Sequence, residues 1–267
     1  MALPKPGTTA LITGASSGIG EAFARALAGR GVNLILVARR AARLEQLARE
    51  LTSAHKVRAE PLAADLTSEQ DLETVRRRVL ETANLELLIN NAGFGARGRF
   101  WEADQDAVER MHRLHVLATV CLMRAALEVM VPKGSGAVIN VSSVAGFSST
   151  PGGAAYCATK AWMNTITEAV ALELEAAGSP VCVQALCPGF TYTEFHDVIG
   201  ADRSAIPRSW WMQAGQVVEA SLEGLAKGKV FVVPGLRYRV LVALAGIVPH
   251  KLRQMAVRIY ARRTKRV

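Results

Sequence analysis

Cysteine is scarce in this chain of 267 residues, and the few copies do not have the spacing of metal ligands. That absence argues against a bound metal, and it gives no sign of a scaffold held together by disulfides. We therefore expect no metal site and a reducing compartment such as the cytoplasm, with free thiols at Cys121, Cys157, Cys182 and Cys187.

A secretory signal and a long apolar run are also missing. The first residues, MALPKPGTTALITG, place two prolines and a lysine before the apolar stretch and lack the core and cleavage site of a signal peptide. The apolar run 240–248 is nine residues long, too short to span a bilayer. Half of the residues are hydrophobic and 21% are charged, which excludes a disordered chain and allows a substantial core.

Acidic residues are absent from the last part of the chain. Residues 236–267 contain nine Lys and Arg and no Asp or Glu. Subtracting these nine from the 32 basic residues leaves 23, which equals the 23 acidic residues, so the net charge of +9 resides in this tail. No linker rich in Ser, Gly or Pro interrupts the interior. We predict one domain over residues 1–235 and a basic, partly apolar extension over residues 236–267.

Short apolar segments alternate with segments of helical periodicity along the first 235 residues. Near-continuous apolar strands that alternate with helices indicate a parallel sheet covered by helices on both faces. The predicted fold class is therefore α/β, a doubly wound parallel sheet of about seven strands. Strands are expected at residues 9–13, 33–38, 57–65, 85–90, 136–143, 181–187 and 229–233, and helices at 20–31, 41–54, 68–83, 104–130, 153–177 and 214–228.

A glycine-rich turn, TGASSGIG at residues 13–20, follows the first expected strand and opens the first helix. Glycines at such a turn let a phosphate approach the backbone N–H groups at the positive end of a helix. A tight turn without a ligand is the simpler alternative. The candidate cofactor-binding residues here are Gly14, Ser16, Ser17, Gly18, Ile19 and Gly20.

The second expected strand lacks a carboxylate at its end, which reads Val37-Ala38-Arg39-Arg40. An acid at this point usually binds the free ribose 2′-hydroxyl of NAD. Arginine instead offers two charge-assisted hydrogen bonds to a 2′-phosphate, so these residues favour NADP(H), with Arg39 as the first candidate. The alternative is that Arg39 and Arg40 are solvated residues at the start of the second helix.

Six motifs in order along residues 7–234 resemble the short-chain dehydrogenase/reductase family, in its single-domain oxidoreductase form with a Rossmann fold. They are TGASSGIG at 13–20, Asp65-Leu66, Asn90-Asn91-Ala92-Gly93, Ser143, Tyr156-x-x-x-Lys160 and Pro188-Gly189. The resemblance implies that Asp65 binds the adenine amino group with Leu66 packed beside it. It implies that Asn91, Ala92 and Gly93 line the cofactor. It also implies that a wall holds the nicotinamide carboxamide, formed by Pro188, Gly189, Thr191 and Thr193.

Tyr156 and Lys160 lie four residues apart, on one side of an expected helix. A phenol has a reference pKa of about 10, and a nearby cation lowers it toward the range useful for proton transfer. We expect Tyr156 to exchange a proton with the substrate oxygen, and the resemblance implies that Lys160 also binds the nicotinamide ribose. Ser143, thirteen residues before Tyr156, would orient the carbonyl, with Ser142 as its competitor because strand neighbours point oppositely.

One departure from the family pattern concerns the helix after the fourth strand. Family members commonly place an asparagine there to hold a water near the lysine, whereas this chain has no asparagine between Asn91 and Asn140. His115 occupies the position. Either it is a core histidine hydrogen-bonded within its helix, or it takes over the water-binding or proton-relay role.

The segment 190–213, FTYTEFHDVIGADRSAIPRSWWMQ, follows the expected nicotinamide wall and is rich in aromatic and apolar residues. A cover of this composition suits a hydrophobic ketone, aldehyde or secondary alcohol. The alternative is that these side chains pack the segment onto the core.

The sequence therefore predicts an NADP-dependent short-chain dehydrogenase/reductase acting on a CH–OH group, with NADPH as cofactor. One alternative is a nucleotide-binding sensor or scaffold with weak turnover. Another is a peripheral-membrane module, because Leu252, Met255 and Ile259 have helical spacing within the basic tail. That tail would bind an anionic membrane surface or a partner subunit. The resemblance implies a homodimer or homotetramer formed through the long helices, and no nucleic-acid binding is expected.

Overall fold

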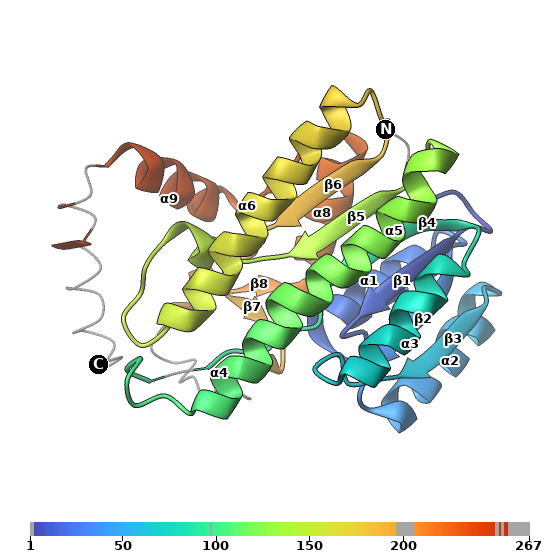
Figure 1. Ribbon diagram of the computed structural model, residues 1–267, viewed down its shortest axis with the longest axis horizontal. Coiled ribbons are helices and arrows are strands. Elements are labelled where there is room, and N and C mark those ends of the chain that lie inside the picture. Colours follow the sequence, from blue (N-terminus) through green and yellow to red (C-terminus); the bar gives the residue numbers. More distant parts are fainter. Residues whose placement is uncertain (1–2, 97, 196–205, 249–250, 252–253, 256–267) are drawn as a thin grey trace.

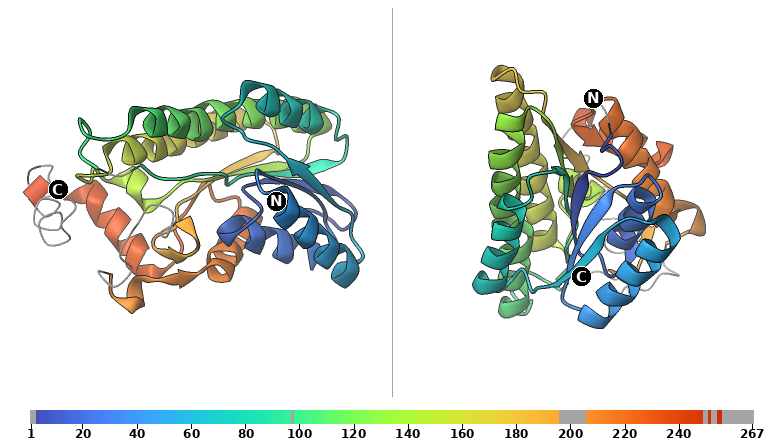
Figure 2. Two further views of the ribbon diagram at one scale, coloured as in Figure 1. Left: turned by 90° about the horizontal axis from the view of Figure 1, so that it is seen from below. Right: turned by 90° about the vertical axis from the view of Figure 1, so that its right-hand side faces the viewer.

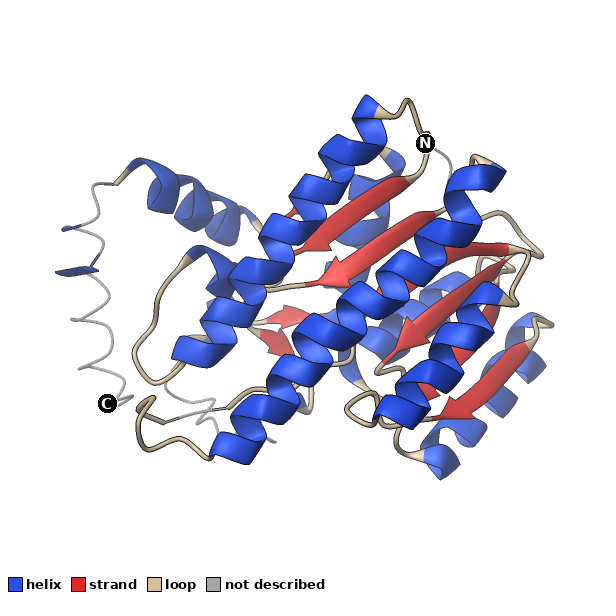
Figure 3. Cartoon of the chain, viewed as in Figure 1, coloured by secondary structure: helices blue, strands red, loops and turns tan. Residues whose placement is uncertain are grey.

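The computed structural model describes residues 3–96, 98–195, 206–248, 251 and 254–255. Seven parallel strands form one sheet in the order β3-β2-β1-β4-β5-β6-β9, and the arrows point the same way in Figure 3. The predicted doubly wound α/β fold with seven strands is confirmed. The strands are β1 (Thr9–Thr13), β2 (Asn33–Ala38), β3 (Ala59–Ala63), β4 (Leu85–Asn90), β5 (Ala137–Val141), β6 (Cys182–Leu186) and β9 (Phe231–Val232).

Helices cover both faces of the sheet, as Figure 2 shows. One layer contains α1 (Gly18–Ala28), α2 (Ala41–His55) and α8 (Ala214–Ala226), which share a buried apolar cluster with the sheet. The opposite layer contains α3 (Glu69–Leu80), α5 (Thr119–Lys133) and α6 (Ala154–Ala176), which share a second cluster. Because apolar side chains cover both faces, all five residues of β1 and all five of β5 are buried.

The longest helical stretch combines three elements and packs on the sheet. It runs from α4 (Gln105–His112) through a π-helical turn, η1 (Arg113–Ala118), into α5. Among the described residues, this is the stretch that is long and apolar enough to span a membrane. Its contacts with β4 and α3 identify it as a core helix. The sequence predicted one continuous helix here and did not predict the π-helical turn.

Polar side chains join the two central strands to α6. Asn90 donates to the Oδ1 atom of Asn140 at 2.9 Å, and Asn140 donates to Thr167 Oγ1 at 2.9 Å. All three side chains are buried, so this pairing is satisfied within the protein and fixes the carboxyl ends of β4 and β5 against the helix.

The segment between β6 and β9 contains short elements of its own. A two-stranded parallel ladder joins β7 (Thr191–Tyr192) to β8 (Met212–Gln213), with a short 3₁₀ helix, η4 (Arg208–Trp210), before β8. After β9, helix α9 (Leu236–Ile247) lies at one end of the molecule in Figure 1. Residues 196–205 lie outside the described residues. The same holds for Leu252 and Ile259, which have helical spacing in the basic tail.

Candidate active site

The motif residues come together at one edge of the sheet. The turn after β1, the loop after β4, the loop after β5 and the loop after β6 all follow the carboxyl ends of parallel strands (Figure 1). In doubly wound sheets this edge, where the strand order reverses between β1 and β4, is where ligands bind. The 3₁₀ helix η2 (Val144–Phe147) directly follows the β5 end.

The glycine-rich turn is built for a close approach. Gly14 has a φ of +66°, which favours glycine, and a Cβ atom on Gly20 would lie 2.3 Å from the carbonyl oxygen of Gly14. The Thr13 hydroxyl accepts hydrogen bonds from the N–H groups of Asn91 and Ala92 at 2.9 and 3.0 Å. The turn is thereby fastened to the loop after β4. The sequence interpretation missed Thr13, although it is the residue that opens the motif.

Arg40, rather than Arg39, contacts the glycine-rich turn. Its guanidinium donates to Ser16 Oγ at 3.0 Å and to the Ser16 carbonyl oxygen at 3.2 Å, and it forms a 3.0 Å ion pair with Glu194. The Arg39 side chain is exposed and has no hydrogen bond or ion pair within the described part of the chain. Both arginines stand at the end of β2, where the sequence predicted the phosphate contact.

Asp65 lies at the end of β3, on the same edge. Its carboxylate accepts hydrogen bonds from the Thr67 hydroxyl at 2.8 Å and from the Thr67 N–H at 3.0 Å. Leu66 is buried in the apolar cluster beneath α3 and α5. The expected contact between Asp65 and an adenine ring stays a prediction.

Ser143, Tyr156 and Lys160 form one cluster. Tyr156 and Lys160 lie in the first two turns of α6, and the Ser143 hydroxyl lies beside the Tyr156 phenol, where it favours the charged form. Ser142 points the other way and donates to the Lys160 carbonyl oxygen at 3.0 Å. The Lys160 ammonium lies 5.7 Å from the centre of the Tyr156 ring and donates to the Val141 carbonyl oxygen at 2.8 Å. Strand alternation thus places Ser143, and not Ser142, beside the phenol.

Burial controls the protonation of this cluster. It raises the pKa of Tyr156 to about 12, and the neighbouring Ser143 hydroxyl opposes that rise. Burial also lowers the pKa of Lys160 to about 8. The expected lowering of the phenol pKa is therefore wrong for this arrangement, because burial disfavours the phenolate while the Lys160 ammonium donates to the Val141 carbonyl oxygen. Tyr156 is consequently a protonated donor at neutral pH.

His115 is buried in the π-helical turn and uses both ring nitrogens. Its Nε2 atom accepts from the Phe94 N–H at 3.2 Å. Nδ1 lies 3.0 Å from Thr159 Oγ1, whose own hydrogen goes to the Tyr156 carbonyl oxygen, so Nδ1–H is the donor. Burial, and secondarily the Lys160 charge, hold the pKa of His115 well below its usual value. This geometry favours a structural role between elements over a proton relay.

The expected nicotinamide wall is ordered by local hydrogen bonds. The Pro188 carbonyl oxygen accepts from the Val144 N–H at 3.0 Å, and Thr191 donates to the Gly189 carbonyl oxygen at 3.1 Å. Thr193 packs against Gly18 of the glycine-rich turn. The wall and the glycine-rich turn are therefore in contact at Thr193 and Gly18.

Aromatic rings continue from this wall over the cluster. Phe195 lies against Tyr156 with ring centres 5.7 Å apart. Trp211 stacks on Tyr192 at 5.0 Å and contacts Phe190 at 5.4 Å. The predicted apolar cover is thus aromatic where the structure describes it, and its central residues, 196–205, lie outside the described ranges.

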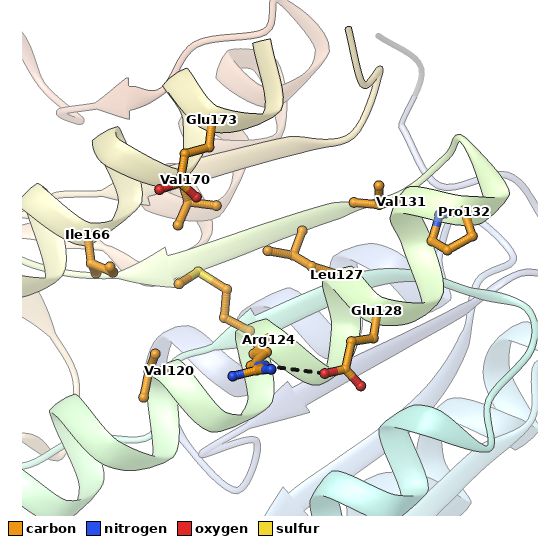
Figure 4. A pocket seen from close by; sticks show the side chains of 10 residues that line it. Val120, Arg124, Leu127, Glu128, Val131, Pro132, Ile166, Val170 and Glu173 are labelled. Atoms are coloured by element: carbon orange, nitrogen blue, oxygen red, sulfur yellow. Dashed lines mark hydrogen bonds and ion pairs between the residues drawn. The ribbon is translucent and has the colours of Figure 1, made fainter. Parts of the chain in front are cut away.

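An apolar hollow on the described surface lies elsewhere. Figure 4 shows an apolar groove of about 580 Å³ between α5 and α6, lined by side chains such as Val120, Leu127, Val131, Ile166 and Val170. It contains none of the motif residues. Its position on the outer face of the two long helices separates it from the candidate site.

The residues at the edge fit a dinucleotide. The turn leaves no room for side chains at Gly14 and Gly20, and the guanidinium of Arg40, which follows β2, binds Ser16 of the same turn. The Glu194 carboxylate already occupies an anion position between Arg40 and the Ser17 hydroxyl. Within the described residues no group of His, Cys, Asp and Glu is placed to hold a metal ion.

Comparisons with known proteins agree with this geometry. A family profile described as short chain dehydrogenase matches residues 8–204. An uncharacterized oxidoreductase of Myxococcus xanthus is 32% identical over 251 residues, which cover 94% of this chain and 96% of that protein.

Solved structures are similar over most of the chain. A short-chain dehydrogenase from Sphingobium yanoikuyae in complex with NADPH has 38% identity and a TM-score of 0.82, covering 88% of this chain and 91% of that one. A bulky-bulky ketone specific alcohol dehydrogenase from Comamonas testosteroni has 33% identity and a TM-score of 0.78, covering 91% and 95%. A Burkholderia phymatum homologue in complex with NAD has 25% identity and a TM-score of 0.81, covering 91% and 94%.

Proposed function

Because the chain belongs to the short-chain dehydrogenase family, we propose that it is an NADP(H)-dependent oxidoreductase that interconverts a hydrophobic ketone or aldehyde and the corresponding alcohol. Oxidoreduction with a nicotinamide dinucleotide follows from the family, and the choice of NADP(H) and of a hydrophobic substrate is our proposal. The observation that carries it is the buried cluster in which the Tyr156 phenol lies beside the Ser143 hydroxyl, with the Lys160 ammonium 5.7 Å from the ring centre.

The chain's own residues handle the substrate oxygen. When bound, the reduced dinucleotide supplies the hydride for the carbonyl carbon. Tyr156, with its pKa raised to about 12, keeps its proton at neutral pH and donates it to the oxygen as that atom gains charge. The Ser143 hydroxyl holds the carbonyl oxygen within reach of the phenol and stabilises the developing anion. Lys160 adds positive charge within 5.7 Å of the ring centre.

The preference for NADP(H) rests on the two arginines at the end of β2. Arg40 is held by Ser16, so its guanidinium is positioned before any ligand arrives. Arg39, exposed beside it, is free to reach the same phosphate. The NADPH complex of the Sphingobium protein supports this choice, although the Burkholderia protein binds NAD.

The substrate class rests on the aromatic cover. The Phe195 ring lies against Tyr156, and Trp211 packs with Phe190 and Tyr192 in the same segment after β6. Such a surface binds apolar groups on either side of a carbonyl. The alcohol dehydrogenase of Comamonas, which is specific for bulky-bulky ketones, supports a large apolar substrate for this chain.

The function is tested by replacing Tyr156 with Phe. We expect the variant to bind NADPH as the wild type does and to lose at least a hundredfold in kcat, because the proton donor is gone while the packing is kept. NADPH consumption with a panel of bulky apolar ketones measures turnover, and fluorescence titration measures binding. A variant that keeps a tenth of the wild-type rate would refute the assignment. Wild-type protein that binds NADPH but reduces no carbonyl would favour the sensor or scaffold.

The assembly proposal rests on the groove in Figure 4. Val120 and Val131 are exposed in this apolar surface, and family resemblance implies that the long helices pair. We propose that a second copy of the chain covers the groove, which gives a homodimer or homotetramer.

A membrane contact is a separate proposal, favoured by the exposed apolar face of α9. Leu244 is 53% exposed and Ile247 is 80% exposed, and both lie on α9 within the basic tail. Apolar side chains beside an excess of positive charge suit an anionic lipid surface. We propose a cytoplasmic protein that contacts such a surface through residues 236–267.

A further inference from the structure

Glu194 contacts a residue of the candidate cofactor site, although it is not one of the catalytic residues. It follows Thr193 of the nicotinamide wall and reaches across the glycine-rich turn to Arg40, with a nitrogen–oxygen distance of 3.0 Å. These residues come from opposite sides of the crevice, because Arg40 follows β2 and Glu194 follows β7. The ion pair therefore closes the crevice at the end where the arginines lie.

The groups that hold the Glu194 carboxylate are those that a phosphate would need. Arg40 supplies a guanidinium fixed by Ser16, and the Ser17 hydroxyl lies close enough to help lower the pKa of Glu194. Ser17 is the N-cap residue of α1, and its side chain makes no capping hydrogen bond. A helix N-terminus, a hydroxyl and a guanidinium together form an anion site, and a carboxylate of the same chain occupies it.

The next residue connects this anion site to the catalytic cluster. Phe195 lies against the Tyr156 ring at 5.7 Å, and its N–H donates to Thr193 Oγ1 at 3.3 Å. Glu194 and Phe195 are neighbours in the chain, so the backbone cannot move one without the other. The position of the carboxylate at Arg40 is therefore linked to the position of a ring above the proton donor.

We propose that Glu194 occupies, in the free protein, the place that the 2′-phosphate of NADP(H) takes between Arg40 and Ser17. The exchange of carboxylate for phosphate then draws Phe195 away from Tyr156. Glu194 is a specificity and positioning residue in this scheme, and the scheme rests on the proposed use of NADP(H). It makes cofactor binding precede substrate access to the phenol.

Charge and exposure explain why the exchange occurs. The side chains of Arg40 and Glu194 are 50% and 55% exposed, and an ion pair in such a setting is weak. A phosphate carries a charge of about −1.5 to −2 and offers three acceptor oxygens, so it competes well for the guanidinium. A carboxylate left beside a bound phosphate would repel it, which makes joint occupancy unfavourable.

The binding test uses fragments that lack the nicotinamide, so turnover plays no part. Adenosine 2′,5′-bisphosphate carries the 2′-phosphate, and 5′-AMP is the matched ligand without it. We expect Glu194→Gln to bind the bisphosphate about two- to fivefold more tightly than the wild type by calorimetry, with 5′-AMP unchanged. Glu219→Gln is the control, because Glu219, on α8, forms a 3.1 Å pair with Arg30, which follows α1. It should leave both affinities unchanged.

The conformational test measures hydrogen exchange over residues 191–195 in the wild type. We expect the bisphosphate, and not 5′-AMP, to speed exchange of the Phe195 amide, and we expect Glu194→Gln to remove that difference. A bisphosphate preference that Glu194→Gln leaves unchanged or weakens would overturn the inference alone. Equal exchange with the two ligands would also overturn it. Equal binding of both ligands by the wild type would overturn the proposed NADP(H) preference as well.

Discussion

Tyr156 and Lys160 are both taken out of water by the same packing, and their pKa values move in opposite directions, to about 12 and about 8. Their spacing predicted that they share one side of a helix, and the structure places them so. Spacing alone could not predict that burial would dominate both pKa values, because burial depends on the residues packed around α6. Nor could it predict that the Val141 carbonyl oxygen receives the ammonium.

The lowered pKa of His115 predicts that the free energy of unfolding depends on pH. The pKa of His115 is well below its ordinary value in the folded protein. Below about pH 6.5, the unfolded chain therefore binds a proton at this imidazole and the folded chain does not. Stability is full above about pH 6.5 and falls as the pH decreases below it, by about 1.4 kcal/mol per pH unit from this group. Urea unfolding between pH 7 and pH 5 should show this slope in the wild type and a shallower one in His115→Asn.

His112→Asn is the matched control, because His112 lies on the same helical stretch with an exposed ring. It should keep the wild-type slope. Parallel curves for the wild type and His115→Asn below pH 6.5 would mean that this imidazole does not titrate on unfolding. A changed pH–rate profile of the Asn variant, with stability held equal, would instead revive the proton-relay interpretation.

At the scale of elements, helix α9 is tied to the substrate side by one tyrosine. The Tyr238 hydroxyl accepts from the Phe190 N–H at 2.9 Å and donates to the Trp210 carbonyl oxygen at 2.6 Å. Its ring packs so closely on Gly189 that a Cβ atom there would lie 2.0 Å from the ring. The start of the extension is therefore part of the wall beside the candidate site.

Tyr238→Phe should destabilise the protein by about 1–3 kcal/mol, because the ring stays while a buried N–H and a carbonyl lose their partner. Chemical denaturation followed by circular dichroism measures the change. Tyr192→Phe is the control, since the Tyr192 hydroxyl has no hydrogen bond within the described residues. Equal stability of Tyr238→Phe and the wild type would show that water replaces the hydroxyl at no cost.

The elements of the sheet were predictable from sequence, and the reason is their burial. Strands covered on both faces are continuous apolar runs, so β2 and β4 match the expected residues 33–38 and 85–90. The short β7–β8 ladder was not predicted, because two-residue strands carry no periodicity. The π-helical turn was not predicted either, since an inserted residue leaves the apolar pattern of the long helix nearly unchanged.

At the scale of the molecule, two apolar surfaces need a partner. The groove between α5 and α6 lies on the outer face of one helical layer, and α9 lies at the end of the molecule (Figures 1 and 4). The candidate site was predictable because its motifs follow consecutive strands. These surfaces were not, because sequence does not say which side of a helix the sheet leaves uncovered.

The groove predicts the assembly state. Replacing Val120 and Val131 together with Glu should dissociate the oligomer in analytical ultracentrifugation, because two charges would enter an apolar interface. Both side chains are exposed in the single chain, so folding should persist. Val240→Glu, on α9, is the control and should leave assembly unchanged. Dissociation by Val240→Glu alone would place the interface on α9.

The α9 face predicts lipid binding. The wild type should float with vesicles that contain about a third phosphatidylserine and remain behind with neutral vesicles. Replacing Leu244 and Ile247 together with Glu should abolish flotation and leave NADPH binding intact, since both side chains point away from the fold. Flotation of that double variant equal to the wild type would contradict the membrane contact.

The strand order has a consequence for how the protein emerges from the ribosome. Strands β1, β2 and β3 are adjacent and lie within the first 63 residues, so three of the seven strands can pair early. The chain then returns once to the open side of β1, and β4, β5, β6 and β9 join in the order of their synthesis. No strand of this sheet has to be inserted between two strands that are already paired. The sheet can therefore assemble during translation until β9 is added at its edge.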